Sequence, residues 1–569
     1  MESWTEEPPR PELPEGYYVD NFAVLLRTVT ERYDDLLSES EAAYASTFLA
    51  LDTAAQRLYV RLVSRKGPCF RRDLLSYPEI DDLGKAAASL IRVGFLDRAE
   101  KAPTAELLAV LRRHELAKLV GALARVDPSA ELSAVKGRKR GELEDHLLNL
   151  ARDPTSAIDP ATEIRRRYEI WRPLHHEVLV LYRLLFFGNL WQSLSEFVIA
   201  DLGIVRYETY SISKRYRWFV ERADIDQGLA VRVLRETVSD LIEAEQLDAA
   251  LALVRSALDE AWRPEARSRL DGVACSVARH LERRERRHEA LELYEFCELP
   301  PARERRCRVL DRLERFDEAL ALCHELQVAP KDETERAFAP AFAHRLKRKS
   351  GLTRAPWKRP RRPTASLEIE PLDRESDSVE SATLKALVAD GRSGIYSENW
   401  FWRSLFGLAF WDIVFAPVPG AFHHPFQVAP ADLSTAGFRA ARRESITERL
   451  QELRECVDLA ARLWPVYEAK FGLANALMPW APGLETPLRW GLDRVAGTAA
   501  ATILDRLSAD WRRYRRGLPD LLIEAPDAPH GFELWEIKGP GDSLRPEQGA
   551  WIDFLNRSGI SAKVVKVRW

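Results

Sequence analysis

Two acids and a lysine near the C-terminal end of the chain could form a hydrolytic site. Asp520 ends the run Gly-Leu-Pro-Asp, and Glu536 and Lys538 follow in Trp-Glu-Ile-Lys-Gly-Pro after a stretch rich in Pro, Asp and Gly. Two carboxylates and an amine that converge on one point are costly to place unless something compensates their charge. A divalent cation would compensate it and would put the amine beside a metal-bound water. The three residues therefore indicate metal-assisted hydrolysis.

Short strands must position these side chains. Two apolar runs separated by Pro, Asp and Gly predict a β-hairpin over about residues 520–538. Strand periodicity puts Glu536 and Lys538 on the same face, and Asp520 at the start of the first strand can reach the same point. A helical pattern follows over residues 544–555, and residues 562–569 predict a final strand. Strand, strand, helix, strand is the order of the PD-(D/E)xK nuclease core.

Length and composition limit what surrounds this core. The 569 residues predict roughly three to five domains. With 84 basic and 88 acidic residues, the net charge of -4 excludes a uniformly basic nucleic-acid-binding protein, so any such surface must come from local clusters. The six cysteines lack zinc-ribbon spacing, and the N-terminus lacks the features of a secretory signal. We expect a cytoplasmic protein that does not enter a membrane, because the most apolar stretch is short and is interrupted by Arg183.

The N-terminal part of the chain predicts two helical modules. Residues 1–100 predict a helical DNA-binding region with basic residues around a turn at Gly67, although an ordinary solvated turn would look the same. Residues 101–155 predict two amphipathic helices joined by a basic turn, a pattern that resembles a SAP module and also fits a plain helical hairpin. The turn could contact DNA phosphates. Its basic residues are Lys136, Arg138, Lys139 and Arg140.

The middle of the chain predicts a helical solenoid. Within residues 156–345 an Ala-Leu phrase recurs at Asp248, His288 and Asp317, which is typical of imperfect tetratricopeptide-like (TPR-like) repeats. Residues 346–380 are strongly basic and then acidic, which predicts a charged linker, and residues 381–569 hold the nuclease core. The predicted fold class is therefore multidomain and mostly α, with an α/β nuclease domain of the PD-(D/E)xK type at the C-terminus.

Several motifs together resemble the VRR-type nuclease domain of the Fanconi-associated nuclease family. They are Leu518-Pro-Asp520, Trp535-Glu536-Ile-Lys538-Gly-Pro, Gln548-x-x-Trp551, and Tyr396-Ser-Glu398-Asn-Trp followed by the apolar residues 405–415. The resemblance implies a structure-selective DNase of the phosphodiesterase I type. It would cleave 5′ flaps and act as a 5′-to-3′ exonuclease in the repair of interstrand crosslinks. It would need one or two Mg²⁺ or Mn²⁺ ions and would bind branched or flapped DNA near the bacterial nucleoid.

The resemblance also assigns roles to residues. It implies Asp520, Glu536 and Lys538 as catalytic residues. It implies four metal ligands, namely Glu398, Asp520, Glu536 and the carbonyl of Ile537. The local pattern places Glu398 in the first turn of a helix, where it could instead serve only the helix dipole.

Three more polar residues and several rival functions remain open. Gln548 could orient Lys538 or the attacking water, or could simply flank Trp551 on the surface. Arg512 and Arg516 could contact phosphate, or could be basic residues at a helix C-terminus. The missing cysteine spacing indicates that the ubiquitin-binding zinc finger of animal relatives is absent, and protein partners are unknown. The alternatives are a resolvase-like or restriction-like nuclease and a non-catalytic DNA-binding scaffold.

Overall fold

The structure is a computed structural model that falls into two compact units. It describes residues 15–125, 138–153, 159–190, 192–198, 205–351, 361–370, 378–435 and 437–569. Unit 1 comprises Met1–Trp218, Arg403–Thr447 and Leu463–Pro482, and unit 2 comprises Phe219–Trp402, Glu448–Arg462 and Gly483–Trp569. No helix in these described ranges is both long and apolar enough to cross a bilayer.

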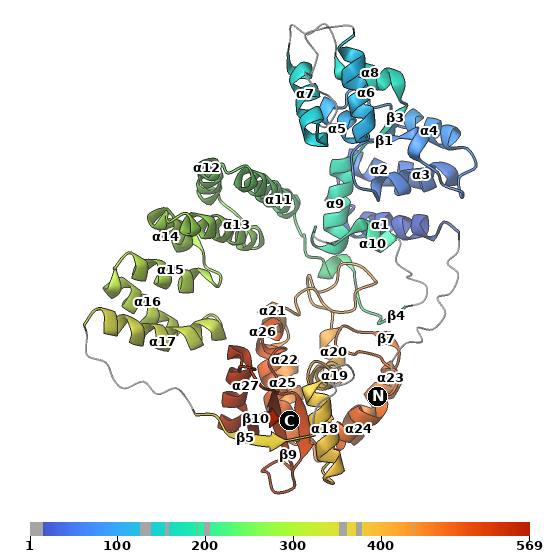
Figure 1. Ribbon diagram of the computed structural model, residues 1–569. Helices are drawn as coiled ribbons and strands as arrows, with labels where there is room; N and C mark the ends of the chain where they lie inside the picture. The colour runs from blue at the N-terminus through green and yellow to red at the C-terminus, as the bar shows by residue number, and fades with distance from the viewer. Residues whose placement is uncertain are drawn as a thin grey trace. The chain divides into compact units, whose positions relative to one another are not determined.

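Unit 1 is mainly helical (Figure 1). Its helices are α1 (Tyr17–Tyr33), α2 (Glu39–Leu49), α3 (Thr53–Val63), α4 (Leu83–Arg92), α5 (Thr104–Ala109), α6 (Arg113–Leu123), α7 (Arg140–Arg152), α8 (Pro160–Arg167), α9 (His176–Phe187), α10 (Leu194–Val198), α20 (Trp411–Val414) and α21 (Gly437–Ala441). Short strands form a sheet in the order β1-β3-β2 and a parallel pair β4-β7. The strands are β1 (Phe70–Arg71), β2 (Leu96–Asp97), β3 (Ile170–Pro173), β4 (Arg206–Tyr207) and β7 (Leu473–Ala474), and 3₁₀ turns lie at Arg72–Leu74 and Lys214–Tyr216.

Aromatic side chains fill the core of the N-terminal helices. The ring centroids of Phe22 and Phe48 lie 4.9 Å apart, as do those of Tyr59 and Phe95. All four side chains are buried. Helix α3 begins after Asp52, whose side chain accepts a hydrogen bond from the first turn. The helical character predicted for this region is confirmed.

Helices α5–α8 form a second small core, in the region that the sequence describes as SAP-like. Leu116 and Leu119 of α6 are buried with Leu143 and Leu147 of α7, so the two helices α6 and α7 pack on each other, while the first predicted amphipathic helix is divided into α5 and α6. The turn between them includes residues 126–137, which lie outside the described residues.

Unit 2 begins with the later part of the predicted solenoid, since the first part of the predicted range 156–345, up to Trp218, belongs to unit 1 and includes strands β3 and β4. Successive helices pack side by side (Figure 1). Ala250, Ala290 and Ala319 from the recurring phrase have no exposed surface, which lets neighbouring helices approach closely. The helices are α11 (Arg222–Glu243), α12 (Leu247–Leu258), α13 (Pro264–Arg283), α14 (Arg287–Phe296), α15 (Ala302–Arg312), α16 (Phe316–Val328) and α17 (Glu333–Lys349).

A five-stranded sheet forms the rest of unit 2, with the order β5-β10-β9-β8-β6. Its strands are β5 (Thr364–Glu368), β6 (Gly394–Tyr396), β8 (Leu521–Glu524), β9 (Phe532–Lys538) and β10 (Ala562–Arg568). The β8–β9 hairpin is antiparallel, and β10 runs parallel to β9 and β5. Residues 364–368 fall in the segment predicted as a linker, so part of that segment belongs to the sheet.

Helices cover the sheet and fix its two faces. Helix α18 (Val379–Ala389) contacts β6 and β9, and Leu387 packs with Trp535 and Ile537 on one face. Helix α27 (Pro546–Arg557) packs against β10. The other helices of unit 2 are α24 (Glu485–Arg494), α25 (Gly497–Ala509) and α26 (Trp511–Tyr514), while α19 (Phe401–Ala409), α22 (Arg443–Arg454) and α23 (Leu459–Lys470) cross the boundary between the units.

Candidate active site

The β8–β9 hairpin places Asp520 and Glu536 at one point. Asp520 directly precedes β8, and the next residue, Leu521, is paired with Trp535 in β9, so Asp520 stands opposite Glu536. The two residues are only 4% and 0% exposed. The backbone N–H of Ile537 donates a 2.7 Å hydrogen bond to Asp520 Oδ2. The strand pattern read from the sequence thus brings the two acids together as expected.

Lys538 completes the predicted trio on the same face of β9. Its Nζ donates a 2.7 Å hydrogen bond to Glu536 Oε1, and the lysine side chain is 13% exposed. The second carboxylate oxygen, Glu536 Oε2, is buried without a hydrogen-bond partner among the described residues. A buried oxygen left in this way carries a desolvation cost that a further ligand would relieve.

Burial, together with nearby negative charge, makes both acids hard to ionise. Burial, and then the charge of Glu536, raises the pKa of Asp520 to about 8, even though the Ile537 N–H favours its ionised form. Burial raises the pKa of Glu536 to about 7 against the opposing effect of Lys538. The charge of Glu398 raises both pKa values further. Such a cluster is typical of a functional site.

The backbone brings Glu398 to this cluster across a long stretch of sequence. The N–H groups of Ser397 and Glu398 donate to the carbonyl of Asp520 at 2.7 and 3.3 Å, where β6 pairs with β8. The hydroxyl of Tyr396 donates a 2.8 Å hydrogen bond to Glu398 Oε2, and this contact together with burial raises the tyrosine pKa. Tyr396 therefore holds the Glu398 carboxylate at the edge of the site.

The expected position of Glu398 in the first turn of a helix is wrong. Helix α19 begins only at Phe401, and Glu398 lies in the turn between β6 and that helix. Asn399 has a φ of 64°, a left-handed conformation that an α-helix cannot contain. The helical spacing of the apolar residues is real, but the turn interrupts it before it reaches Glu398.

Glu380 is a fourth acid near the site, and sequence reasoning missed it. It lies in the first turn of α18, and its charge raises the pKa values of Asp520, Glu536 and Tyr396. In the sequence it ends the acidic run that predicts a linker. The serine that caps α18, Ser378, and the apolar spacing after it were the available signal for a helix that starts there.

Gln548 is buried, and its side chain makes a hydrogen bond that supports the start of α27. Its Oε1 accepts a 2.9 Å hydrogen bond from the backbone N–H of Arg545, which caps the first turn of α27. Gly517, with a φ of 81°, packs so closely against the start of α27 that a Cβ at this position would lie 2.8 Å from the backbone nitrogen of Gln548. The expected role of Gln548 toward Lys538 or a water stays a prediction.

The basic residues before Asp520 differ in their contacts. Arg512 and Arg516 are exposed, and neither makes an ion pair with another described residue. Arg513 is instead paired with Asp332, with 3.4 Å between its guanidinium and the carboxylate. The indole of Trp551 donates to the carbonyl of Arg516 at 3.0 Å and anchors this segment on α27. Arg512 and Arg516 therefore remain candidates for phosphate contact.

Some of the basic residues predicted to contact DNA in unit 1 instead contact other residues of the SAP-like region. Arg140 donates a 2.7 Å hydrogen bond to the carbonyl of Leu111 and pairs with Glu144 at 2.7 Å. The carbonyl of Arg138 accepts from the guanidinium of Arg113 at 2.9 Å. Lys139 is exposed at the start of α7. Lys136 lies outside the described residues, so its predicted DNA contact has no structural counterpart here.

The donor set at the sheet end fits a hard divalent cation. Within the described ranges, no three Asp, Glu, His or Cys side chains gather closely enough to enclose a metal by themselves. The site is centred on the pair Asp520 and Glu536, and the peptide N–H of Ile537 is hydrogen-bonded to Asp520. Their high pKa values and the unpartnered Oε2 of Glu536 both indicate that positive charge is missing there. Oxygen donors of this kind suit Mg²⁺ or Mn²⁺.

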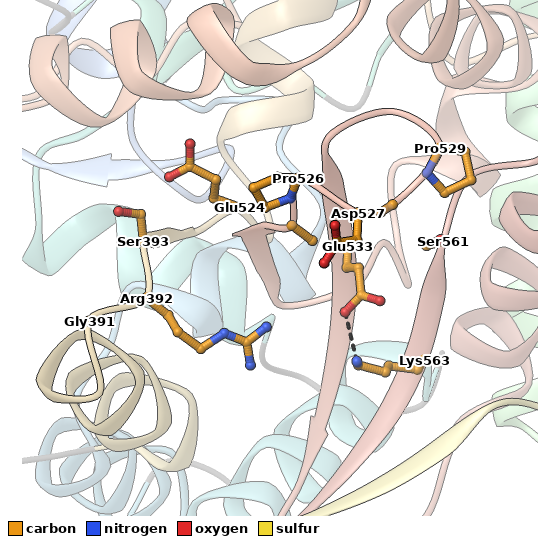
Figure 2. A pocket seen from close by; sticks show the side chains of 12 residues that line it. Gly391, Arg392, Ser393, Glu524, Pro526, Asp527, Pro529, Glu533, Ser561 and Lys563 are labelled. Carbon is orange, nitrogen blue, oxygen red and sulfur yellow. Dashed lines mark ion pairs between the residues drawn. The ribbon is translucent and has the colours of Figure 1, made fainter.

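A hollow of about 640 Å³ lies at the opposite end of the hairpin (Figure 2). It is lined by the turn after Glu524 and by residues of β9 and β10. Glu533 and Lys563 form a 2.7 Å ion pair across it, and Glu524 pairs with Arg494 at 3.2 Å. Glu533 and Glu524 are thus each engaged in an ion pair, away from the Asp520–Glu536 end of the hairpin.

Two family models match separate parts of the chain. A model described as the HTH domain of FAN1 matches residues 16–97, and a model described as the VRR-NUC domain matches residues 458–569. The first range covers the N-terminal helices, and the second covers the hairpin with Asp520, Glu536 and Lys538.

Whole-chain relatives extend this match. The chain is 35% identical to the Fanconi-associated nuclease 1 homolog of Pseudomonas aeruginosa, over 98% of this chain and 97% of that protein. It is 26% identical to human Fanconi-associated nuclease 1 over 97% of this chain, but spans only 62% of the human protein. A crystal structure of paFAN1 bound to DNA with a 2-nucleotide 5′ flap and a gap matches with a TM-score of 0.82 and 34% identity, over 98% of this chain and 99% of that one.

Proposed function

The chain belongs to the Fanconi-associated nuclease family, a family of DNA nucleases, and we propose that it cleaves 5′ flaps in DNA and degrades strands in the 5′-to-3′ direction. In this proposal it is a structure-selective nuclease of DNA repair, of the phosphodiesterase I type, which processes interstrand crosslinks. The structures of paFAN1 with flap DNA support the substrate class. The observation that carries the proposal is the buried pair Asp520 and Glu536 with Lys538 bonded to it at the sheet end.

The site residues divide the chemistry of phosphodiester hydrolysis between them. Asp520 and Glu536 would hold one or two Mg²⁺ or Mn²⁺ ions, with the carbonyl of Ile537 and the carboxylate of Glu398 as further oxygen donors. When bound, such a cation supplies positive charge to a phosphate oxygen and lowers the pKa of a water. The ammonium of Lys538 holds the attacking water and offsets negative charge that develops on the phosphate.

Two more residues support this set. Tyr396 donates a 2.8 Å hydrogen bond to the carboxylate of Glu398 and so limits its movement. Glu380 adds negative charge from the first turn of α18 and strengthens the attraction of the site for cations. Neither effect needs a change in the backbone, because both residues already lie beside the β8–β9 hairpin.

DNA is the proposed partner, held by basic residues near the site and in the SAP-like region. Arg512 and Arg516 precede the catalytic strand and are exposed. Lys139 and Arg138 lie at the start of α7, where a helix N-terminus also favours phosphate. With such a partner the protein would act at the nucleoid in the cytoplasm. We propose no protein partner for the cleavage.

A cleavage assay on end-labelled DNA tests the proposal. The substrates are a 5′ flap, a Holliday junction and a plain duplex of the same sequence, each with Mn²⁺ and with EDTA. We expect metal-dependent incision of the flap at least tenfold faster than of the other two. Asp520→Ala, Glu536→Ala and Lys538→Ala should each abolish cleavage and leave DNA binding largely intact.

The results separate the proposal from its rivals. Faster cutting of the junction would indicate a resolvase-like enzyme, and equal cutting of the duplex would indicate a restriction-like enzyme. Binding without any cleavage would indicate a DNA-binding scaffold. Retained cleavage by Asp520→Ala at millimolar Mn²⁺ would refute the assignment of the site.

A further inference from the structure

One face of the solenoid carries more positive charge than its buried acids balance. The odd-numbered helices contact one another, α11 with α13 and α15 with α17, so they form one layer of the solenoid. Side chains of α13, α15 and α17 meet on this layer through ion pairs and ring contacts, and we call the surface they form the odd-helix face. It comprises Glu282 of α13, Arg305, Arg308, Asp311 and Arg312 of α15, and Phe338, Phe342, Arg345 and Lys349 of α17.

Two bases share one buried acid where α13 meets α15. The side chain of Glu282 is only 3% exposed, and it pairs with Arg305 at 2.6 Å and with Arg312 at 3.0 Å. The hydroxyl of Tyr294 also donates a 3.3 Å hydrogen bond to Glu282. Since one carboxylate balances one guanidinium group, one positive charge is left over. The side chain of Arg312 is 52% exposed, so this charge lies at the surface.

The same arrangement recurs where α15 meets α17. The side chain of Asp311 is 8% exposed, and it pairs with Lys349 at 2.7 Å and with Arg345 at 3.4 Å. Both bases are about half-exposed, so they too can reach a molecule in solution. The leftover positive charge therefore repeats from one helix to the next along the odd-helix face.

Other ion pairs of the solenoid match one base with one acid. Arg255 of α12 pairs with Glu292 at 2.5 Å, and Arg315 pairs with Glu318 of α16 at the same distance. These pairs show that helix packing in the solenoid does not require two bases for each acid. One base already neutralises each buried acid of the odd-helix face, and an exposed ion pair adds little stability. The second base is therefore available to an anion from outside the chain.

The aromatic rings of the odd-helix face argue against single-stranded nucleic acid as this anion. The guanidinium carbon of Arg308 lies 4.9 Å from the ring centroid of Phe338, and that of Arg345 lies 4.3 Å from the centroid of Phe342. The two rings also contact each other, with 4.5 Å between their centroids. Proteins hold unpaired bases largely by stacking them on aromatic rings, and these two rings are already covered. The face offers positive charge without a stacking surface, which suits the carboxylates of a polypeptide.

The spacing of the charges fits an extended polypeptide. Packed helices lie about 8–10 Å apart, and an extended chain rises about 3.3 Å per residue. Acids at every third residue would therefore meet successive helices of the solenoid, a type of fold that presents extended binding surfaces. We propose that the odd-helix face binds an extended acidic segment of a partner protein, whose carboxylates pair with Arg312 on α15 and Arg345 on α17. This binding does not depend on the cleavage of DNA, because neither arginine belongs to the nuclease site.

Fluorescence anisotropy with two labelled peptides tests the proposal on the full chain in EDTA. Both peptides consist of about 12 residues, long enough to cross three helices, with alanine, serine and glutamate in the same proportions. The spaced peptide has a glutamate at every third position, and the clustered peptide has all its glutamates at one end. We expect the spaced peptide to bind at least fivefold more tightly, because only its carboxylates reach successive helices.

A double variant removes the exposed excess charge while each buried acid keeps its other base. Arg312→Gln combined with Arg345→Gln should weaken binding of the spaced peptide at least tenfold. The matched control combines Arg255→Gln with Arg315→Gln, which removes two arginines of similar exposure that each pair with one exposed glutamate. The control should change binding less than twofold, because it lowers the charge of the chain equally but leaves the odd-helix face intact.

Thermal unfolding followed by circular dichroism shows whether the double variant is folded. If it is not, Lys349→Gln alone decides, because it removes one exposed charge and leaves Arg345 paired with Asp311. This variant should weaken binding of the spaced peptide at least threefold. Equal binding of the two peptides, unchanged binding in a folded variant, or equal loss in the double variant and its control would overturn the proposal.

Nucleic acid is tested as the other possible occupant in the same assay. A labelled single strand and a labelled duplex are titrated in EDTA, and we expect the double variant to change the binding of either less than twofold. A tenfold loss of DNA binding in the double variant without binding of the spaced peptide would overturn the proposal and assign the face to DNA. Flap cleavage in Mn²⁺ should be unchanged in the double variant. Absent cleavage by the unaltered chain would refute the proposed function only, because peptide binding is read without metal.

Discussion

Asp520→Asn should stabilise the metal-free nuclease sheet while abolishing cleavage. The substitution keeps the shape of the side chain and an oxygen that can accept the Ile537 N–H, but it removes a charge that Glu536 repels. A mutation that destroys the site and strengthens the fold at the same time would show that the fold holds Asp520 against the cost of its burial and the charge of Glu536.

The expected gain in the free energy of unfolding follows from the pKa of Asp520. Burial and Glu536 raise it from 3.8 to about 8. Each pKa unit corresponds to about 1.4 kcal/mol, so ionised Asp520 costs at most about 6 kcal/mol of stability. Relaxation and water entry around a buried charge reduce such penalties, and we expect about 3 kcal/mol in practice.

The sign of the effect depends on pH. Below about pH 4 the carboxyl is protonated in both the folded and the unfolded chain, so the wild type carries no penalty. As pH rises from 4 to 8, the unfolded chain loses its proton first, and the folded wild type becomes progressively less stable. Above pH 8 the penalty is complete. The advantage of Asp520→Asn should therefore grow over this pH range and then level off.

Hydrogen exchange of a β9 peptide reads this local stability directly. At pH 9 in EDTA, about 3 kcal/mol corresponds to roughly 100-fold slower exchange in Asp520→Asn than in the wild type. At pH 5, which is only about 1.2 units above the unfolded pKa of 3.8, the ratio should fall to about 15-fold. Adding Mn²⁺ should slow exchange in the wild type and not in the variant, because only the wild type gains stability from binding.

A matched control makes this result interpretable. Asp527→Asn is the same substitution at an exposed position in the turn of the same hairpin, and it should leave exchange unchanged at both pH values. Equal or faster exchange in Asp520→Asn than in the wild type at pH 9 would refute the penalty that burial and the charge of Glu536 place on ionised Asp520. It would also remove the main argument that the site binds a cation.

Three further outcomes are expected. Glu398→Gln should cut the flap-cleavage rate by orders of magnitude and raise the Mn²⁺ concentration that cleavage requires. Tyr396→Phe should raise only that Mn²⁺ concentration. A Glu398→Gln enzyme with a near-normal rate would show that Glu398 is not a metal ligand. Gln548→Ala should cost about 0.5–2 kcal/mol of thermal stability through the lost cap, and a large loss of kcat without loss of stability would instead support its catalytic role. Arg512→Ala with Arg516→Ala should lower the log–log salt slope of DNA binding by about 0.9 per lost phosphate contact, and an unchanged slope would show that neither arginine touches DNA.

The catalytic hairpin could be predicted from sequence because its information is local. Strand side chains alternate with a period of two, so the spacing of Glu536 and Lys538 alone puts them on one face. The turn residues between the two strands then bring Asp520 to that face. The Ala-Leu phrase of the solenoid was equally local, and its alanines are buried where the pattern placed them.

Longer-range features could not be predicted in the same way. Glu398 lies more than a hundred residues before Asp520, and only the family resemblance connected them. Glu380 reaches the site because α18 packs on the sheet, which no local pattern reveals, and the acidic run before it favoured a solvated linker. The cap that Gln548 provides was missed because Arg545 is not a usual capping residue.

Most of the charged groups at the site already have a hydrogen-bond partner within the protein. Lys538 is bonded to Glu536, Tyr396 to Glu398, and the Ile537 N–H to Asp520. These contacts fix the carboxylates in place but leave the burial of Asp520 beside the charge of Glu536, and one buried oxygen of Glu536, uncompensated. A cation that binds there gains the free energy that the folded chain loses by holding the acids together. The same charges should therefore lower the stability of the nuclease sheet in EDTA above pH 7 and strengthen its affinity for a divalent cation. A variant that restores the stability by removing a charge must therefore weaken the binding of the cation.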